Sequence, residues 1–229
     1  MILILLFHRK FIINLNFSWI NSFSKTYLLE KIWSNIHETS DLALWNQIRL
    51  GDEEAFTSLF ERYYVTLVNY GKTLLNGEDL VKDCVQDVFI DIWTYRFKLN
   101  EASVVKAYLL SSVRKRIARY HTRDHIFSNI KKIDSLDFLF DFSIEDQLIA
   151  DETSAQKVEQ LNRSINKLSA RQKEALYLRY HQGLSVEQVS EVLNLNYQST
   201  KNLLYRAILH LRKEFPLSLL VLLYNFPIN

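Results

Sequence analysis

The sequence predicts an all-α protein made of two small helical domains joined by an acidic linker. Residues that break helices are rare, because the 229-residue chain has four glycines and two prolines and no proline precedes Pro216. Apolar residues recur at helical spacing, without the long alternation typical of strands. With 48% hydrophobic and 24% charged residues, the composition is typical of a globular chain.

The net charge of +2 is small, but the charges are unevenly distributed. Residues 103–123 carry six bases and no acid: Lys106, Arg114, Lys115, Arg116, Arg119 and Arg123. Residues 134–152 carry seven acids and no base: Asp134, Asp137, Asp141, Glu145, Asp146, Asp151 and Glu152. Beyond Lys157 the charge is again mainly basic. This order suggests two lobes that bind nucleic acid, one on each side of an acidic connection.

Five segments are expected from these shifts in composition. Residues 1–40 form an N-terminal extension for which the sequence suggests no role, and the first helical domain spans 41–123. The acidic linker covers 124–155, the second helical domain 156–213, and an apolar tail 214–229.

The apolar runs at both ends are far shorter than the roughly 20 residues that a membrane-spanning helix needs, so no membrane span is expected. The single cysteine, Cys84, excludes an internal disulfide and fits a cytoplasmic protein. Because it lies on a predicted helix, we expect a small buried residue, not a nucleophile.

Three helices are predicted in the first domain. Asp52 is placed to cap a helix that ends before Asn76 and Gly77. Its expected buried side is Ala55, Leu59, Phe60, Tyr63, Tyr64, Leu67 and Val68. The second helix spans about Asp79–Tyr95. Its expected buried stripe is Leu80, Cys84, Val85, Val88, Phe89, Ile92 and Trp93. A loop over Arg96–Ser103 leads to a basic helix at about Val104–His121.

The second domain contains a predicted helix-turn-helix between Gly183 and Lys213. Ser185 and Gln188 form a capping-box pattern, and Ser169 with Gln172 forms another upstream. Asn194 occupies the turn, where a residue that tolerates positive φ is needed. Asn196 can cap the next helix. The expected buried side of that helix is Leu203, Leu204, Ala207, Ile208 and Leu211.

The exposed start of this last helix has side chains suited to the major groove of DNA. The amides of Gln198 and Asn202 match adenine, while Lys201 and Arg206 suit phosphates or guanine. The alternative is an ordinary helical hairpin with a solvated polar face. An enzyme is a more distant alternative: His121 and His125 have the i, i+4 spacing of metal ligands, but no acidic or thiol ligand motif accompanies them. We therefore expect no metal, no cofactor and no catalytic residue.

Three further segments accompany the helix-turn-helix in a fixed order: Gly51–Tyr64, Asp83–Trp93 and Ala107–Arg114. With Leu168–Arg212, they resemble the extracytoplasmic-function (ECF) sigma factors of the sigma-70 family, and most closely the Bacteroidetes-type branch. The resemblance covers about residues 42–213. It implies a non-enzymatic subunit that binds core RNA polymerase and directs recognition of the promoter −10 and −35 elements in transcription initiation.

The resemblance also implies roles for individual residues. The clamp on the coiled coil of the polymerase β′ subunit would be formed by Asp83, Gln86, Asp87 and Asp91. The −10 element would be met by Asn100, Tyr108, Arg114, Lys115, Arg116, Arg119, Tyr120 and Arg123. The −35 element would be met by Tyr197, Gln198, Ser199, Lys201, Asn202 and Arg206.

The second domain would also dock on the polymerase β flap, and many relatives have an inhibitory anti-sigma factor. Many members carry Asn and Asp where this chain has Lys115 and Arg119, so its −10 helix is more basic. The alternative function is that of a helix-turn-helix transcription regulator that never acts as a sigma subunit. Such a protein would not need the acidic helix that contains Asp83 and Asp87.

Overall fold

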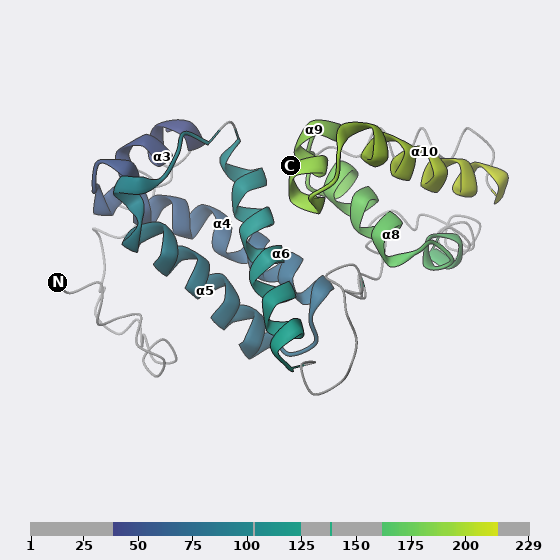
Figure 1. The fold of residues 1–229 in the computed structure, drawn as a ribbon, viewed down its shortest axis with the longest axis horizontal. Helices are drawn as coiled ribbons and strands as arrows, with labels where there is room; N and C mark the ends of the chain where they lie inside the picture. Colours follow the sequence, from purple (N-terminus) through teal and green to yellow (C-terminus); the bar gives the residue numbers. More distant parts are fainter. Residues whose placement is uncertain (1–38, 103, 125–137, 139–161, 215–229) are drawn as a thin grey trace, which may run out of the picture.

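The structure, a computed structural model, describes residues 39–102, 104–124, 138 and 162–214. Residues 39–124 form what we call the N-terminal lobe and residues 162–214 the C-terminal lobe (Figure 1). All regular elements in these ranges are helical, which confirms the all-α prediction. Nearly all of the predicted acidic linker, like the N-terminal extension up to residue 38 and the tail from residue 215, lies outside the described residues.

The N-terminal lobe contains four α-helices and a short 3-10 turn. They are α3 (Asp41–Arg49), α4 (Glu53–Leu74), α5 (Glu78–Thr94), the turn η1 (Arg96–Lys98) and α6 (Val105–Asp124). Asp52 caps α4 as predicted, because its Oδ1 accepts hydrogen bonds from the backbone N–H groups of Glu54 and Ala55, both at 2.9 Å. The sequence patterns located α5 and α6 to within one to three residues, but the predicted loop after α5 contains η1.

Helices α4, α5 and α6 pack on one another around the core of this lobe. Gly71 permits a close approach, because a Cβ atom at this position would lie 2.5 Å from Cγ1 of Val81 and 3.4 Å from Cδ1 of Ile117. The predicted stripe of α5 is buried from Cys84 to Ile92, and Trp93 is partly buried. Leu80 was wrongly assigned to this stripe. It is 36% exposed and lies in the first turn of α5, beside Gly77 at the helix start.

The C-terminal lobe begins with a helical stretch at residues 162–166. It continues with α8 (Ala170–Leu176), the π-helical turn η5 (Tyr177–His181), α9 (Val186–Leu193) and α10 (Tyr197–Glu214). Both predicted capping boxes are present at the starts of α8 and α9. Asn194 adopts the left-handed conformation at φ 52°. The Oδ1 of Asn196 accepts from the backbone N–H of Ser199 at 2.7 Å, so the predicted cap of α10 is also present.

The two lobes touch each other along α6, which packs against α9 (Figure 1). Phe138, which lies in the predicted linker region, is buried with its ring centroid 5.6 Å from that of Tyr177 in the C-terminal lobe. None of the helices in the described ranges is long and apolar enough to cross a membrane. Cys84 is a free, buried thiol, and burial raises its pKa to about 11. Both findings for Cys84 agree with a packing role.

Candidate nucleic-acid interface

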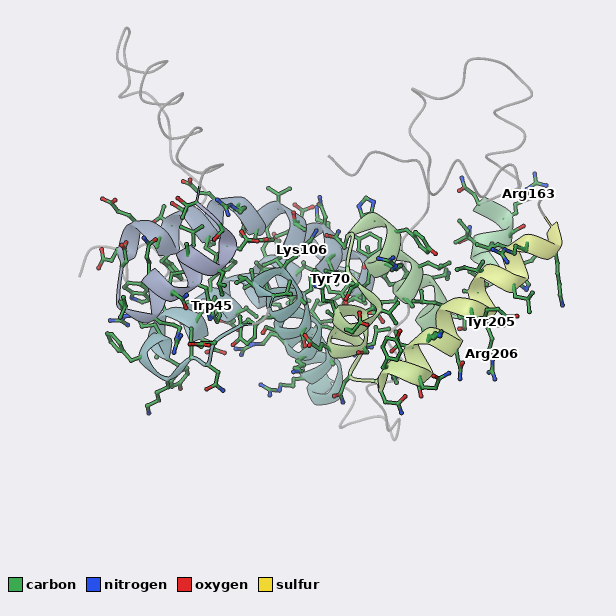
Figure 2. The ribbon with its side chains drawn as sticks, turned by 90° about the horizontal axis from the view of Figure 1, so that it is seen from above. Trp45, Tyr70, Lys106, Arg163, Tyr205 and Arg206 are labelled. Carbon is green, nitrogen blue, oxygen red and sulfur yellow. The ribbon has the colours of Figure 1, made fainter. Side chains whose placement is uncertain are left out.

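The first half of α10 presents a continuous polar surface. Each of the six residues expected at the −35 element is exposed: Tyr197, Gln198, Ser199, Lys201, Asn202 and Arg206. The Nε2 of Gln198 donates to Oδ1 of Asn202 at 3.1 Å, which holds the two amides together on one face. Figure 2 shows that Arg206 and its neighbour Tyr205 project outward from α10, far from the N-terminal lobe.

The opposite side of α10 is anchored in the C-terminal lobe. Thr200, Leu204, Ala207 and Leu211 are buried, at the i, i+4, i+7 and i+11 positions of one helical face. Leu203 and Ile208, also predicted to be buried, are partly buried and pack against the core. Burial of this apolar face against the lobe leaves the polar residues on the opposite side of the helix exposed to solvent.

A second polar surface lies on α6 beside α5. Lys115 and Arg119 are exposed on it, and Tyr108 is 39% exposed. These three side chains help to line a pocket with Arg116 and, from α5, Asp91. Cations beside an aromatic ring are suited to a nucleic-acid backbone with an unpaired base. Tyr120 is partly buried against the core, and the side chain of Arg123 lies outside the described part of the chain.

Arg114 differs from the other −10 candidates, because its side chain is 6% exposed. Its Nε donates to Oε1 of Glu174 in α8 at 2.9 Å, and its Nη2 donates to Oε2 at 3.3 Å. In this arrangement the side chain of Arg114 is buried against Glu174 and is not exposed to solvent. The residue occupies the side of α6 that faces the C-terminal lobe.

The loop that precedes α6 is held by α3. The Nε1 of Trp45 donates to the backbone carbonyl of Asn100 at 3.1 Å, and the Trp45 ring meets the ring of Tyr108 edge-on at a centroid distance of 4.9 Å. Arg49 of α3 lies 3.7 Å from a carboxylate oxygen of Glu101. Ser103 lies outside the described residues. The buried indole of Trp45 thus ties the candidate Asn100 to the candidate Tyr108.

The acidic face of α5 is exposed at Asp83, Asp87 and Asp91, while Gln86 is partly buried. Arg116 of α6 pairs with Asp91 and lies 3.7 Å from Asp87. The acidic face and the basic surface therefore share an ion-pair cluster. Asp83 stands apart, because within the described ranges no cation lies within ion-pair distance of it.

A buried polar cluster joins the two lobes. The Tyr70 hydroxyl of α4 donates to Oε1 of Glu174 at 2.7 Å, so this carboxylate receives bonds from two elements of the N-terminal lobe. Desolvation, together with the Glu174 charge, raises the pKa of Tyr70 well above its usual value. The Tyr70 ring stacks on that of Tyr177, with centroids 5.9 Å apart and planes at 11°.

Lys106 forms the second polar link between the lobes. Its Nζ donates to the backbone carbonyl of Gln182, after η5, at 2.6 Å. Burial lowers the pKa of Lys106. Burial also lowers the pKa of His181, with a contribution from the nearby charge of Lys106. Figure 2 shows Tyr70 and Lys106 on the side of the N-terminal lobe that faces the C-terminal lobe, with Trp45 farther away.

Comparisons with known proteins assign both lobes. Residues 59–125 match the family model for Sigma-70 region 2, and residues 158–211 match the model for Sigma-70, region 4. The chain is 25% identical over 163 residues to the RNA polymerase sigma factor YlaC of Bacillus subtilis, covering 70% of this chain and 92% of the relative. It is 24% identical to the ECF RNA polymerase sigma factor SigX of the same organism, covering 72% of this chain and 86% of the relative.

This chain belongs to the extracytoplasmic-function sigma factors. It is an RNA polymerase subunit that acts in transcription initiation, and sigma factors are regulatory subunits, not enzymes on their own. The fold of this sigma factor is similar to that of CnrH in its complex with the cytosolic domain of CnrY. The similarity has a TM-score of 0.50 at 20% identity and covers 76% of this chain and 95% of CnrH.

Sequence patterns did not identify three residues that hold the loop before α6 or join the two lobes of this sigma factor. Trp45 lies on α3, before the first predicted helix, and no local pattern connects it to Asn100. Tyr70 and Glu174 lie 104 residues apart. The one local signal is that Glu174 directly precedes the apolar run from Ala175 to Leu178, where a buried, unpaired carboxylate would be costly.

We expect Trp45→Phe to loosen the loop around Asn100 while leaving the N-terminal lobe folded. The substitution keeps an aromatic ring but removes the donor to the Asn100 carbonyl, a loss of about 1 kcal/mol in the free energy of unfolding. Promoter-directed transcription should fall while the affinity for core polymerase is unchanged. Trp93→Phe is the matched ring exchange, because it keeps the Trp45–Asn100 bond. Equal transcription from both variants would contradict a positioning role for Trp45.

Proposed function

We propose that this sigma factor recognises the −35 element with the exposed face of α10. The observation that carries the proposal is that Tyr197, Gln198, Ser199, Lys201, Asn202 and Arg206 share one solvent-facing surface at the start of a helix-turn-helix recognition helix. The amides of Gln198 and Asn202 can read adenine, and the cations can hold phosphates. We also propose that this lobe docks on the polymerase β flap.

The −10 element is assigned to the α5–α6 pocket and the loop before it. Lys115, Arg116 and Arg119 supply positive charge for the backbone, and Tyr108 supplies a ring on which an unpaired base can stack. Asn100 stands at the edge of this surface, where the Trp45 bond fixes its backbone. Tyr120, Arg123 and Arg114 complete the proposed set, although Arg114 first has to leave Glu174.

The clamp on the β′ coiled coil is assigned to the acidic face of α5. Asp83, Asp87 and Asp91 are exposed along one side of a rigid helix, with Gln86 between them. Short acidic side chains held in this way can pair with basic residues on a partner helix. Because Arg116 bonds Asp91 and approaches Asp87, the clamp and the −10 surface share a boundary.

We also propose roles for the domains, a family branch, a cellular location and a regulatory partner. Residues 41–123 would act as the core-binding and −10 domain, 124–155 as an acidic linker, and 156–213 as the −35 domain. We place the chain in the Bacteroidetes-type branch and in the cytoplasm, where its polymerase acts. The structure of CnrH holds the cytosolic domain of CnrY, and by analogy we propose that an anti-sigma factor controls this chain.

Asp83→Lys is expected to weaken binding to core polymerase by about tenfold or more, because it replaces an attraction with a repulsion at the clamp. Asp83 gives the most specific test of the clamp, because reversal of its charge leaves the Arg116 pairs with Asp87 and Asp91 intact. Glu61→Lys, at an exposed acid of α4, is the matched control and should bind normally. Fluorescence anisotropy of the labelled chain against core polymerase would measure both. Unchanged affinity of Asp83→Lys would contradict the clamp assignment.

The function as a whole is tested by reconstituted transcription. Purified chain with core polymerase should start RNA at promoters that core polymerase alone ignores. Alanine at both Gln198 and Asn202 should reduce initiation most at promoters with a strong −35 element. A failure of the chain to raise initiation anywhere in a promoter library would favour a helix-turn-helix regulator that does not act as a sigma subunit.

A further inference from the structure

A second pocket adjoins the proposed −10 surface, where the loop before α6 meets that helix. Its volume of about 350 Å³ lies at the lower end of the range typical of small-ligand pockets. Ala102, Val104 and Ala107 give it an apolar lining. Tyr108 and Lys115 line both this pocket and the pocket between α5 and α6. A ring and a cation of the proposed −10 surface are therefore shared by two neighbouring hollows.

Two carboxylates also line the second pocket, Glu101 from the loop before α6 and Glu191 from α9. The loop that carries Glu101 is held by α3, because Trp45 donates to the backbone carbonyl of the preceding Asn100. The Nη1 of Arg49, also on α3, lies 3.7 Å from Oε1 of Glu101. The Glu101 side chain is nevertheless 85% exposed, so a ligand can reach it. The loop thus presents an accessible carboxylate whose position is influenced by α3.

A carboxylate distinguishes among unpaired bases, because in its ionised form it accepts hydrogen bonds and donates none. The Watson–Crick edge of an unpaired guanine presents two adjacent donors, N1–H and N2–H, to which the two oxygens of one carboxylate can bind together. Cytosine and adenine each present one amino group beside a ring acceptor. Thymine presents a single N3–H between two carbonyl oxygens, which repel a carboxylate. Guanine is therefore the unpaired base that a carboxylate favours.

Two cations offset the negative charge of Glu101 towards a DNA strand. Arg49 lies beside the carboxylate, and Lys115 lines the same pocket from α6. Such cations can hold the phosphates that flank a base, while the ring of Tyr108 can stack on the base itself. Phosphate contacts and stacking tolerate any sequence. Recognition of base identity in this pocket is therefore left to the carboxylate.

We propose that Glu101 selects guanine at one unpaired position of the −10 element, and that Arg49 is the positioning residue for its carboxylate. This inference rests on the proposed role of the α6 surface at the −10 element, and it names a base that this surface reads. Glu101 accepts from N1–H and N2–H of the guanine, Tyr108 stacks on the base, and Lys115 binds a neighbouring phosphate. Glu191 belongs to the other lobe, and we assign no base contact to it.

The base preference is tested on the full chain bound to core polymerase. A promoter at which the chain initiates is prepared with its −10 element held unpaired by mismatches, and each unpaired position of either strand is changed to each of the four bases. Fluorescence anisotropy measures the affinity of each fragment. At one position guanine should bind about tenfold more tightly than thymine. Deoxyinosine, which lacks the N2 amine, should lose most of this advantage. The absence of a guanine preference at every position would overturn the inference.

Substitution of Glu101 separates base reading from support of the loop. Glu101→Gln replaces one of the two acceptors with a donor, and such an amide suits adenine. The preference at that position should move from guanine to adenine, and the loss with deoxyinosine should disappear. If Glu101 only supported the loop, the variant would bind all four bases more weakly by the same factor, and that result would overturn the base assignment.

The positioning role of Arg49 is tested on the same fragments. Arg49→Gln should narrow the preference for guanine over thymine without creating a preference for adenine. Arg49→Lys should restore the preference for guanine, because lysine keeps a positive charge beside Glu101. An unchanged guanine preference in Arg49→Gln would overturn the positioning role.

Glu191→Gln is the matched control, because it makes the same change at the other carboxylate that lines the pocket. Its base preference should stay with guanine, and a move to adenine in this variant would overturn the assignment to Glu101. Initiation without any guanine preference would contradict this inference and leave the proposed function in place. An absence of initiation from every form at every promoter would contradict the proposed function, and this inference with it.

Discussion

The buried contact between Arg114 and Glu174 is the constraint on which the arrangement of the two lobes depends. Neither charge can remain in this site alone, because an uncompensated buried charge destabilises a protein by about 3–5 kcal/mol. Tyr70 adds a third group, and its hydroxyl reaches the carboxylate from α4. With these donors fixed, α8 must lie against α4 and α6, and α9 then packs along α6. This cluster and the bond from Lys106 to Gln182 hold the proposed −35 face of α10 in place relative to the proposed −10 surface of α6.

Helix α6 therefore performs three tasks on three of its faces. One face, which includes Leu110, Val113 and Ile117, is buried in the core of its own lobe. A second carries the cations beside α5, where Arg116 joins the basic surface to the acidic face proposed for polymerase. The third carries Arg114 and Lys106 to the C-terminal lobe. Because these faces share one helix, α6 contacts both the acidic face of α5 and the C-terminal lobe.

Local chemistry was predictable from the sequence, whereas contacts between distant segments were not. The caps at Asp52, Ser185 and Asn196, and the left-handed turn at Asn194, depend on residues within a few positions, and the structure contains all of them. Glu174 and Arg114 are 60 residues apart, and no periodicity links them. The positive charge of Arg114 suggested a contact with DNA. Its side chain is buried because it lies on the face of α6 that packs against the C-terminal lobe. The prediction that Leu80 is buried was wrong because Leu80 lies in the first turn of its helix.

Chemical modification of Arg114 reports whether its side chain is buried between the lobes. An arginine-selective dicarbonyl reagent, followed by mass spectrometry, can compare modification of Arg114 with that of exposed Arg119 on the same helix. In the free chain we expect exposed Arg119 to react while Arg114, buried against Glu174, is protected. Equal reaction of the two arginines in the free chain would contradict a buried contact between Arg114 and Glu174.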